Sequence, residues 1–592
     1  MDKKNTFIGL ALIVAAIASL WVSMRYSPQR PATPAAVRQA VAQQQTAPAA
    51  GAAPQSLRDA APEAEFAAAH VDHAGAKITL LENDFVQVRL TDFGGAIRDV
   101  ALKQYPLTRG ASQPTVFNEM HADPMLALVD FPGFDRSTRF QLVSQSATEV
   151  VYRASVANRL EVTHRYVLSP NASDSADPYQ IRTETTFRNL TGQPSTPMTV
   201  SVALGTAAPF DALDNGLLLA TGYSDGKHQN FIPRHKLEAS GGFLGFSAHD
   251  AVPSIETPGP VVWGAVSNRF FAAILTPDQP GASLVTRRVK LLTELPDTAT
   301  TAYGITEDVR LEVPGLAAGA SATIGGGLYV GPKEYHRLSN SDVFKADQDK
   351  IMQFGMFKFF SALLLTLMTW IHSFVPNWGT AIVCTTLTLK IIFLPLTIAA
   401  SRSAKRMQKI QPQLKALNEK YKDNPQKKNT ATMELFKEHK VNPMGGCLPL
   451  LITFPFFIGF FSMLQSTAEL RFAPFLWATD LSMPDTVGHI FGIPINVLPI
   501  LLGITSFMQM RMIPQPTMDN AQAKMMMFTP IIFLVICYSY SCALSLYSTT
   551  NGIFTIIQQL VINRMKGDGD PASAAPSPGG KPLKNVTPPK KR

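Results

Sequence analysis

The chain has 592 residues, of which 46% are hydrophobic and only 16% are charged, and its formal net charge is +9. This length accommodates several domains, and the apolar fraction is too high in places for an ordinary soluble protein, so we expect membrane segments. The four cysteines, Cys384, Cys447, Cys537 and Cys542, all lie in or beside apolar runs of the C-terminal half. We interpret them as small apolar packing residues, because they outline no disulfide framework.

Residues 1–26 form the first predicted element, a transmembrane anchor. Two lysines precede the apolar run FIGLALIVAAIASLWVSM, which is just long enough to span a bilayer. A cleaved signal peptide is the alternative, because its apolar region has the same flanks. We favour a retained anchor, since Arg25 and Tyr26 follow the run in place of a small-x-small cleavage site. Residues 27–65 are rich in Ala, Pro and Gln and predict a disordered linker.

Residues 66–347 predict a large extracytoplasmic β-sandwich. Hydrophobic and polar residues alternate with period two in FVQVRL, QIRTETTF and VRLEV, and clusters of Gly, Pro, Asn and Asp separate such segments. The histidines of this region show no metal-ligand spacing, and no nucleophile motif accompanies them. We therefore predict no catalytic residue, no metal and no cofactor.

Beyond Gln348 the sequence changes to six long apolar runs, and the charges between them predict the topology. Residues 401–444 hold eleven Lys and Arg against four acidic residues, and seven Lys and Arg follow Ile562, so both regions are expected in the cytoplasm. The connection 467–490 holds one basic residue, Arg471, and is expected outside. With the N-terminal lysines inside and the sandwich outside, an even number of crossings must return the tail to the cytoplasm. One of the runs therefore does not cross.

The run that does not cross is predicted to be an interfacial amphipathic helix at 348–377. It carries Lys358 and ends in WIHSFVPNW, whose tryptophans and histidine are typical of a membrane-water interface. The predicted fold is a polytopic α-helical membrane protein with an N-terminal anchor, a five-helix core and an outer β-sandwich. The remaining predicted elements are spans at 378–400, 445–466, 491–510, 525–542 and 543–563, a basic helical hairpin at 401–444, a cytoplasmic loop at 511–524 and a basic cytoplasmic tail at 564–592.

Lys390 lies near the middle of the span 378–400, about 15 Å from either surface at 1.5 Å per residue. That is too far for its stem to carry the ammonium to the interface, and a lysine at a span centre costs about 2.5 to 3.5 kcal/mol. None of the five core spans contains Asp or Glu, so we expect water to stabilise the charge. On a straight helix Thr386, Thr397 and Ser401 lie within about 60° of Lys390, which predicts a polar stripe running to the cytoplasmic end.

Polar residues of the other spans are expected to line the same cavity. The alternative is that their hydroxyls and amides bond across helices or back to the backbone, as is common in membrane bundles. That alternative does not account for Lys390, because an unpaired ammonium is costly in lipid. The residues are Thr453, Thr505, Ser506, Gln509, Ser545, Ser548, Thr549, Thr550 and Asn551, with Gln558 and Gln559 nearer the cytoplasm.

Four segments resemble the YidC membrane protein insertases of Gram-negative bacteria, members of the YidC/Oxa/Alb family. They are WIHSFVPNWG, LKIIFLPLT, VNPMGGCLPLLITFPFF and LYSTTNGIFTIIQQ, and the stretch NPMGGCLP is very specific. The resemblance covers the whole chain. It implies a periplasmic sandwich of the galactose-mutarotase type, a location in the cell inner membrane with both termini cytoplasmic, and a groove open to the cytoplasm and to lipid. The implied function is the insertion and folding of inner-membrane proteins, alone or with the Sec translocon, and not an enzyme activity.

Three positions depart from what is usual in this family. Arginine is usual where this chain has Lys390, so the charge is kept but the guanidinium's fork of donors is lost. Glutamine is frequent where Thr453 stands. An aromatic residue and a displaced Ser-Asn pair are frequent where residues 548–552 stand. These departures concern the detailed contacts of the groove and not its charge.

The implied mechanism starts with a nascent membrane protein client that enters the groove, where Lys390 attracts its acidic residues. The client's apolar segment then slides into lipid along the third and fifth spans. No nucleotide-binding motif is present, so hydrophobic transfer and the membrane potential are expected to drive the step. The predicted groove residues are Lys390, Thr386, Thr397, Thr453, Thr505, Gln509, Ser548 and Asn551. The predicted slide residues are Phe454, Pro455, Phe457, Phe528, Pro530 and Phe533.

The two basic cytoplasmic regions predict further partners. In the hairpin 401–444, Met407, Ile410 and Leu414 recur at helical spacing, and the hairpin is expected to meet clients or the ribosome. The tail KPLKNVTPPKKR is expected to contact either the phosphates of ribosomal RNA or anionic membrane lipids. No DNA partner is expected.

Two other classes of protein compete with an insertase. A transporter or channel with an extracytoplasmic β domain is the first, but a proton-coupled transporter is expected to carry intramembrane Asp or Glu and inverted repeats, and the core shows neither. A sugar-processing enzyme is the second, and it needs an acid and base pair in a cleft of the outer domain.

Overall fold

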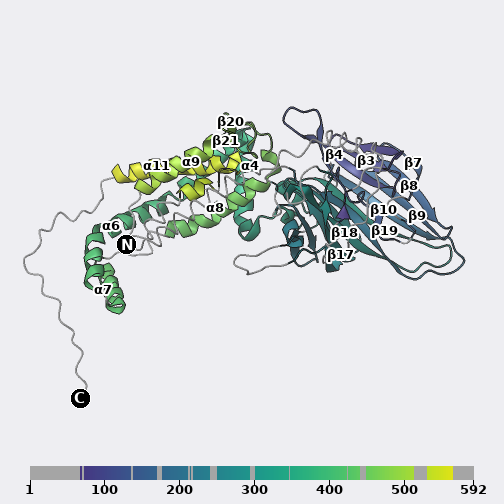
Figure 1. The fold of residues 1–592 in the computed structure, drawn as a ribbon, viewed down its shortest axis with the longest axis horizontal. Helices are drawn as coiled ribbons and strands as arrows, with labels where there is room; N and C mark the ends of the chain where they lie inside the picture. The colour runs from purple at the N-terminus through teal and green to yellow at the C-terminus, as the bar shows by residue number, and fades with distance from the viewer. Residues whose placement is uncertain are drawn as a thin grey trace, which may run out of the picture.

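The computed structural model describes residues 67–69, 73–131, 133–134, 138–169, 177–210, 214, 218–239, 250–293, 300–345, 347–422, 424–439, 448–512, 530–535 and 537–564. The predicted anchor, the linker, most of the loop 511–524 and nearly all of the tail 564–592 lie outside these ranges. Figure 1 shows a β-sandwich at one end and a set of long helices at the other.

The alternating segments form the strands of a sandwich, as predicted. In β9 (Leu160–Leu168) and β10 (Gln180–Asn189) every second side chain is buried, which is the period of a pleated strand with one face on a core. Strands β11 (Met198–Ala207) and β18 (Tyr303–Val313) of one sheet pack against β15 (Trp263–Ser267) and β16 (Phe271–Pro277) of the other. The described strands of the larger sheet run in the order β13 (Gln229–Pro233), β12 (Ala220–Ser224), β15 (Trp263–Ser267), β16 (Phe271–Pro277), β19 (Ser321–Pro332), β10, β9, β8 (Glu149–Val156) and β7 (Gln141–Gln145).

Two further sheets complete the described part of the sandwich. The opposing sheet has the order β1 (Ala67–Ala68), β17 (Gly281–Lys290), β18 (Tyr303–Val313), β11 (Met198–Ala207) and β6 (Leu128–Val129), with β14 (Ser254–Val261) also paired to β17. A smaller sheet has the order β2 (Ile78–Glu82), β3 (Val86–Thr91), β4 (Ala96–Pro106) and β5 (Pro114–Phe117). Short helices follow strands β13, β17 and β19 in the chain, at η1 (Arg234–Leu237), η2 (Thr300–Ala302) and α3 (Tyr335–Leu338).

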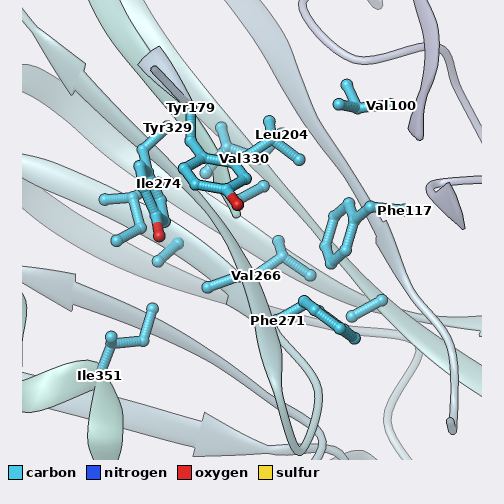
Figure 2. Close-up of a cluster of buried hydrophobic side chains, with 14 of the residues drawn as sticks. Val100, Phe117, Tyr179, Leu204, Val266, Phe271, Ile274, Tyr329, Val330 and Ile351 are labelled. Atoms are coloured by element: carbon cyan, nitrogen blue, oxygen red, sulfur yellow. The ribbon is translucent and has the colours of Figure 1, made fainter. Parts of the chain in front are cut away.

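The core of the sandwich continues into the helices without a break. Figure 2 shows Phe271 and Ile274 of β16 near Val266, together with Ile351 from the short helix that leaves the sandwich. The same cluster of buried hydrophobic side chains includes Leu364 and Phe460 of the helical part. Burial of this shared apolar surface joins the two parts.

The helical part begins where the last strand ends. Its described elements are η3 (Gln348–Met352), η4 (Gly355–Phe357), α4 (Lys358–Phe374), α5 (Trp378–Ile392), α6 (Leu394–Lys420), α7 (Pro425–Glu438), α8 (Leu448–Ser466), η6 (Ala468–Leu470), β20 (Thr486–Ile490), β21 (Ile493–Asn496), α9 (Val497–Met512) and α11 (Cys542–Arg564). Helix α4 packs against α5 and α8, and α11 packs against α5 and α9.

The predicted interfacial helix is α4, preceded by two short 3₁₀ turns. Its buried residues Leu364, Leu365, Met368 and Ile371 follow helical spacing, and the hydroxyl of Ser361 donates to the carbonyl of Gly459 on α8 at 2.9 Å. By length and composition alone, Gly355–Phe374 is the one unbroken helix among the described residues that is long and apolar enough to cross a membrane. Its interfacial position therefore remains a prediction.

The span 378–400 is not a straight helix, contrary to the prediction. Helix α5 ends at Ile392, and α6 continues from Leu394 at an angle of 56° between Trp378–Ile392 and Leu394–Ser403. Pro395 explains the bend, because it has no N–H for the Ile391 carbonyl and its ring would clash with that carbonyl in a continuous helix. Because α6 then runs on to Lys420, the predicted boundary at 400 falls inside a helix.

The described helices also begin or end at other residues than two further predicted spans do. Residues 491–496, predicted to begin the span 491–510, form a turn and strand β21, and helix α9 begins at Val497. The described helical residues of the span predicted at 525–542 end at Cys537, and a turn separates them from α11. An apolar run of this length does not by itself distinguish a strand from a helix end.

Two buried arginines join the sandwich to the core in opposite directions. Arg269 of the sandwich donates from Nε to the carbonyl of Gln465 at the end of α8 and from Nη2 to that of Ser482, both at 2.9 Å. Arg471, from the connection after α8, reaches back into the sandwich. It donates to the carbonyls of Pro106 at 2.7 Å and Leu107 at 2.9 Å and to the hydroxyl of Thr115 at 3.0 Å. Its guanidinium also lies 4.1 Å from the centre of the Phe210 ring.

A buried carboxyl lies in the same junction. Oε2 of Glu469, in η6, is shielded from solvent and has no hydrogen-bond partner among the described residues. Burial, with the nearby charge of Glu334 from the sandwich, raises the pKa of Glu469 to about 8. The junction is therefore built around a carboxyl that stays protonated near neutral pH.

Replacing Arg471 with Met should destabilise the junction, because three acceptors in the sandwich lose a charged donor that is worth about 1.5 to 3 kcal/mol per hydrogen bond. We expect the melting temperature of the purified protein in detergent to fall by several degrees. Arg153→Met is the matched control, since Arg153 is exposed and lies 4.0 Å from Glu161. Equal melting temperatures for Arg471→Met and the control would contradict the assigned contacts.

Glu469→Gln should change how stability depends on pH. Glutamate in an unfolded chain has a pKa of about 4.3, so between that value and about 8 the unfolded protein loses a proton that the folded protein keeps. The free energy of unfolding contributed by this group therefore falls as pH rises, by up to about 1.4 kcal/mol per pH unit. We expect the variant to melt above the wild type at pH 8.5 and close to it at pH 5. A difference in melting temperature between variant and wild type that stays the same from pH 5 to pH 8.5 would show that Glu469 is not held protonated.

Candidate functional site

Lys390 lies in the last turn of α5, just before the bend. Lys390 is half-buried, and its ammonium donates a hydrogen bond of 2.7 Å to the hydroxyl of Thr555 on α11. The Thr555 hydroxyl donates in turn to the carbonyl of Asn551, also at 2.7 Å. A chain of two hydrogen bonds therefore links the ammonium to the backbone of α11.

No carboxylate balances this charge in the helices that the structure describes around it. Helices α4, α5, α8, α9 and α11 contain no Asp or Glu, and Lys390 has no ion-pair partner within the described residues. A lysine in an apolar span must therefore be stabilised by hydroxyls, by backbone carbonyls and by water. The Thr555 hydroxyl supplies one such group.

Helix α11 contributes a polar face that passes Lys390. Ser541 just before the helix, then Ser545, Ser548 and Thr555, follow one another at spacings of four, three and seven residues, which place them on one side. The hydroxyl oxygens of Ser541, Ser545 and Ser548 are shielded from solvent and find no hydrogen-bond partner among the described residues. Because buried polar groups are seldom left unpaired, this face is suited to ordered water or to a polar segment of another chain.

The sequence prediction missed Thr555, which is a direct hydrogen-bond partner of Lys390. A signal was present in the sequence, because Thr555 follows Ser548 by seven residues and so lies on the same helix face. The predicted polar residues passed from Asn551 directly to Gln558 and Gln559 and left Thr555 out.

The bend at Phe393 separates the predicted stripe of α5 into two parts. Thr386 is buried and donates to the carbonyl of Ile382 at 2.7 Å, while Thr397 lies on α6 and donates to Phe393 at 2.9 Å. Both hydroxyls thus bond back to their own helix. These two threonines therefore follow the alternative given above, in which hydroxyls bond back to the backbone and do not line a cavity.

Helices α9 and α11 approach closely at Gly552, and this contact brings two predicted groove residues together. A Cβ atom at Gly552 would lie 2.8 Å from the Thr505 hydroxyl and 2.9 Å from Nε2 of Gln509. The Thr505 hydroxyl donates to the carbonyl of Leu502 at 3.0 Å. Glycine is therefore required here for the polar side chains of α9 to meet α11.

The other predicted groove residues are placed less directly against Lys390. Ser548 is buried on the polar face of α11, and Asn551 is half-buried one turn later. Thr453 is half-buried on α8. The structure thus links Lys390, Thr555 and Asn551 through consecutive hydrogen bonds. It also places Thr505 and Gln509 against the same helix, α11.

The predicted slide residues form two groups. Phe454 is half-exposed on α8. Phe457 instead packs with its ring centre 6.1 Å from that of Phe533 and 6.2 Å from that of Tyr547 on α11. Pro455 is half-buried within α8, Pro530 is buried, and Phe528 lies outside the described residues.

The cysteines lie as the apolar pattern predicts in the described spans. Cys537 and Cys542 are buried and Cys384 is half-buried, all as free thiols, while Cys447 lies outside the described residues. Among the described residues no group of three or more His, Cys, Asp or Glu is placed to hold a metal ion.

Comparison with known proteins covers both parts of the chain. Residues 78–367 match a family model described as the YidC periplasmic domain, and residues 370–568 match one described as 60Kd inner membrane protein. The membrane protein insertase YidC of Francisella tularensis subsp. novicida is 30% identical over 507 residues, which cover 82% of this chain and 84% of that relative.

Other relatives match over shorter segments. The insertase YidC of Pelobacter propionicus is 42% identical over 260 residues, which cover 43% of this chain and 47% of the relative. The insertase of Paraburkholderia xenovorans is 37% identical over 313 residues, 53% of each chain. With these two relatives the match thus spans about half of their own length.

Solved structures give weaker likenesses. A crystal structure of an active YidC insertase, with its first transmembrane domain resolved, aligns with a TM-score of 0.32 and 18% identity over 85% of this chain and 95% of that one. A putative aldose 1-epimerase from Escherichia coli K12 aligns with a TM-score of 0.27 and 12% identity over 44% of this chain and all of that one. At these scores neither likeness supports an inference about chemistry. The sequence matches identify the protein instead: the chain belongs to the YidC family of membrane protein insertases.

Proposed function

We propose that this protein inserts and folds proteins of the inner membrane, with the ammonium of Lys390 as the group that receives polar parts of a client. The single observation that carries the proposal is the hydrogen bond from Lys390 to Thr555 in helices that offer no carboxylate among their described residues. A cation that lacks a counter-ion in an apolar surrounding attracts acidic side chains and carbonyl groups of a client.

The surrounding polar groups suit the same role. The polar face of α11 and the side chains of Thr505 and Gln509 offer hydroxyls and an amide along the path past Lys390. A client that passes exchanges part of its hydration for these groups, which lowers the cost of moving it into the membrane. In the proposed groove, open to the cytoplasm and to lipid, the half-exposed Phe454 meets the client's apolar segment.

The proposed topology places both termini in the cytoplasm and the sandwich in the periplasm. The support is the excess of basic residues in 401–444 and after Ile562. Helices α6 and α7 then form a cytoplasmic hairpin, which we propose meets clients or the ribosome. The Sec translocon and membrane lipids are the other proposed partners.

Transport of a small solute and a sugar-directed enzyme activity are less well supported. The described spans hold no acidic residue of the kind that couples transport to protons. The sandwich residue Glu307 is fully buried in the core, and a carboxyl closed off from any cleft does not make a convergent acid and base pair.

Lys390→Met tests the proposal, because methionine retains an unbranched stem without the charge. We expect the initial rate of insertion of a small single-span client into liposomes to fall about tenfold or more, scored by protease protection, since a charged interaction is worth about 1.5 to 3 kcal/mol. Lys390→Arg is the matched control and should retain most of the rate.

Stability separates this effect from misfolding. Removing an ammonium that costs about 2.5 to 3.5 kcal/mol in an apolar span should leave the melting temperature of Lys390→Met equal to the wild type or above it. Wild-type insertion rates in Lys390→Met would exclude the lysine as the receiving group for that client.

Thr555→Val tests whether the hydrogen bond positions the ammonium. Valine has nearly the shape of threonine and no acceptor, so insertion should fall severalfold, while Thr555→Ser should restore it. Thr388→Val is the matched control, because that hydroxyl on α5 donates only to the Cys384 carbonyl. In the Lys390→Met background Thr555→Val should have little further effect, since the two residues act as a pair. Full additivity of the two substitutions would contradict a positioning role.

A further inference from the structure

The hairpin of β20 and β21 exposes an apolar tip at the outer end of the helical core. Phe491 is 98% exposed, Ile490 57% and Val487 54%. Figure 1 shows the hairpin at the end of the helices that faces the sandwich. Such a cluster on one small element is unusual for a surface that meets only water.

The residue at the tip is not explained by the turn. Phe491 and Gly492 have φ of 51° and 80°, so both central residues adopt the left-handed conformation of a two-residue hairpin turn. Asn, Asp and Gly are the residues that favour this conformation, and a bulky aromatic residue is strained there. Phenylalanine at this point therefore reflects a requirement other than formation of the turn.

The base of the hairpin is fixed to the core. Nδ2 of Asn496 donates to the carbonyl of Tyr538 at 2.7 Å, and the Tyr538 hydroxyl donates to the carbonyl of Pro494. Just before β20, Asp485 accepts from the backbone N–H of Leu498 at 2.7 Å. An isolated two-stranded hairpin is marginally stable, so these contacts hold the tip in a defined place beside the start of α9.

The chemistry of the hairpin continues into the helix that follows it. From Thr486 to Met510 the sequence contains no Asp, Glu, Lys or Arg. The exposed apolar side chains Ile500 and Ile504 on α9 extend the surface of the hairpin along the helix. In a protein of the inner membrane, such a helix face meets lipid, and the hairpin is continuous with it.

We propose that the β20–β21 hairpin dips its tip, Ile490 and Phe491, into the outer leaflet of the bilayer at the boundary between headgroups and acyl chains. The partner is the lipid surface itself. This placement rests on the proposed topology, in which this end of the core faces the periplasm. Aromatic and aliphatic side chains favour that boundary, and without Asp, Glu, Lys or Arg the hairpin bears no permanent charge that would exclude it from there. The hairpin thereby fixes the height of α9 in the membrane from outside.

Depth-dependent quenching of a fluorescent label tests the proposal. Phe491→Cys is labelled with a nitrobenzoxadiazole thiol reagent and reconstituted in phosphatidylcholine and phosphatidylglycerol vesicles, with iodide on both sides as aqueous quencher. Lipids that carry a nitroxide near the headgroup are the membrane quencher. We expect the nitroxide lipid to reduce the fluorescence by about half and iodide to have little effect, as for a side chain at the interface. The wild-type protein, labelled in parallel, gives the background from its own cysteines.

Two further labelled variants make the result specific. Leu142→Cys, on the exposed edge strand β7 of the sandwich, should be quenched by iodide and not by the nitroxide lipid. Val487→Cys, nearer the base of the hairpin, should be quenched by the nitroxide lipid less strongly than Phe491→Cys. Because both native side chains are exposed, neither substitution removes core packing.

Two outcomes would overturn the proposal. Iodide quenching at Phe491→Cys equal to that at Leu142→Cys would place the tip in water. Protection from both quenchers would place it against protein, either a second copy or a partner. Client insertion is measured on the same vesicles. If clients insert normally while iodide quenches the tip, only the proposal about the hairpin is refuted. If the nitroxide lipid quenches the tip but clients do not insert, only the proposed function is refuted.

Discussion

An ammonium group that must be stabilised where apolar helices meet is the constraint on which the helical core depends. Lys390 has a hydroxyl partner in Thr555 and no carboxylate in the described helices around it. A carboxylate at that position would form a closed ion pair, which would satisfy the charge and leave it unavailable. A hydroxyl satisfies one of the three donors of the ammonium, which leaves two for water or, in the proposed function, for a client. The composition of the described helices thus leaves the ammonium without a counter-ion.

The two ends of the helices are held very differently. At the end next to the sandwich, Arg269 and Arg471 donate hydrogen bonds across the junction in opposite directions, and Asp485 and Asn496 fix the connection between α8 and α9. At the other end, α6 leaves the bend at Phe393 and, with α7, extends away from the other helices (Figure 1). In the proposed topology the firmly held end faces the periplasm and the projecting hairpin faces the cytoplasm, the side from which clients are proposed to arrive.

Sequence patterns predicted the architecture because the periods of strand and helix differ so clearly here. Alternation in 180–187 and in 309–313 predicted strands that the structure contains, and the long apolar runs predicted the helices of the core. The same patterns failed at the ends of elements. The apolar run that begins at Phe491 is compatible with either a strand or the start of a helix. The turn at Gly492 and the contacts of Asn496 decide between the two. Partners are harder still: charge counting placed Arg471 outside, but not within the sandwich.

The candidate site shows the same division between composition and geometry. Lys390 was recognisable from the energetic cost of a lysine in an apolar run alone. Its partner Thr555 lies on another helix, so the contact depends on how α5 and α11 pack. Pro395 ends α5 directly after Lys390, so the ammonium lies at a helix end and reaches α11 instead of following a stripe on its own helix. The bend moves Thr397 off the face of Lys390, while Thr386 stays on α5 with it, and both hydroxyls donate to carbonyls of the backbone four residues before them. The proline therefore determines which polar groups can act with the lysine, and a continuous helix with the same residues would have a different site.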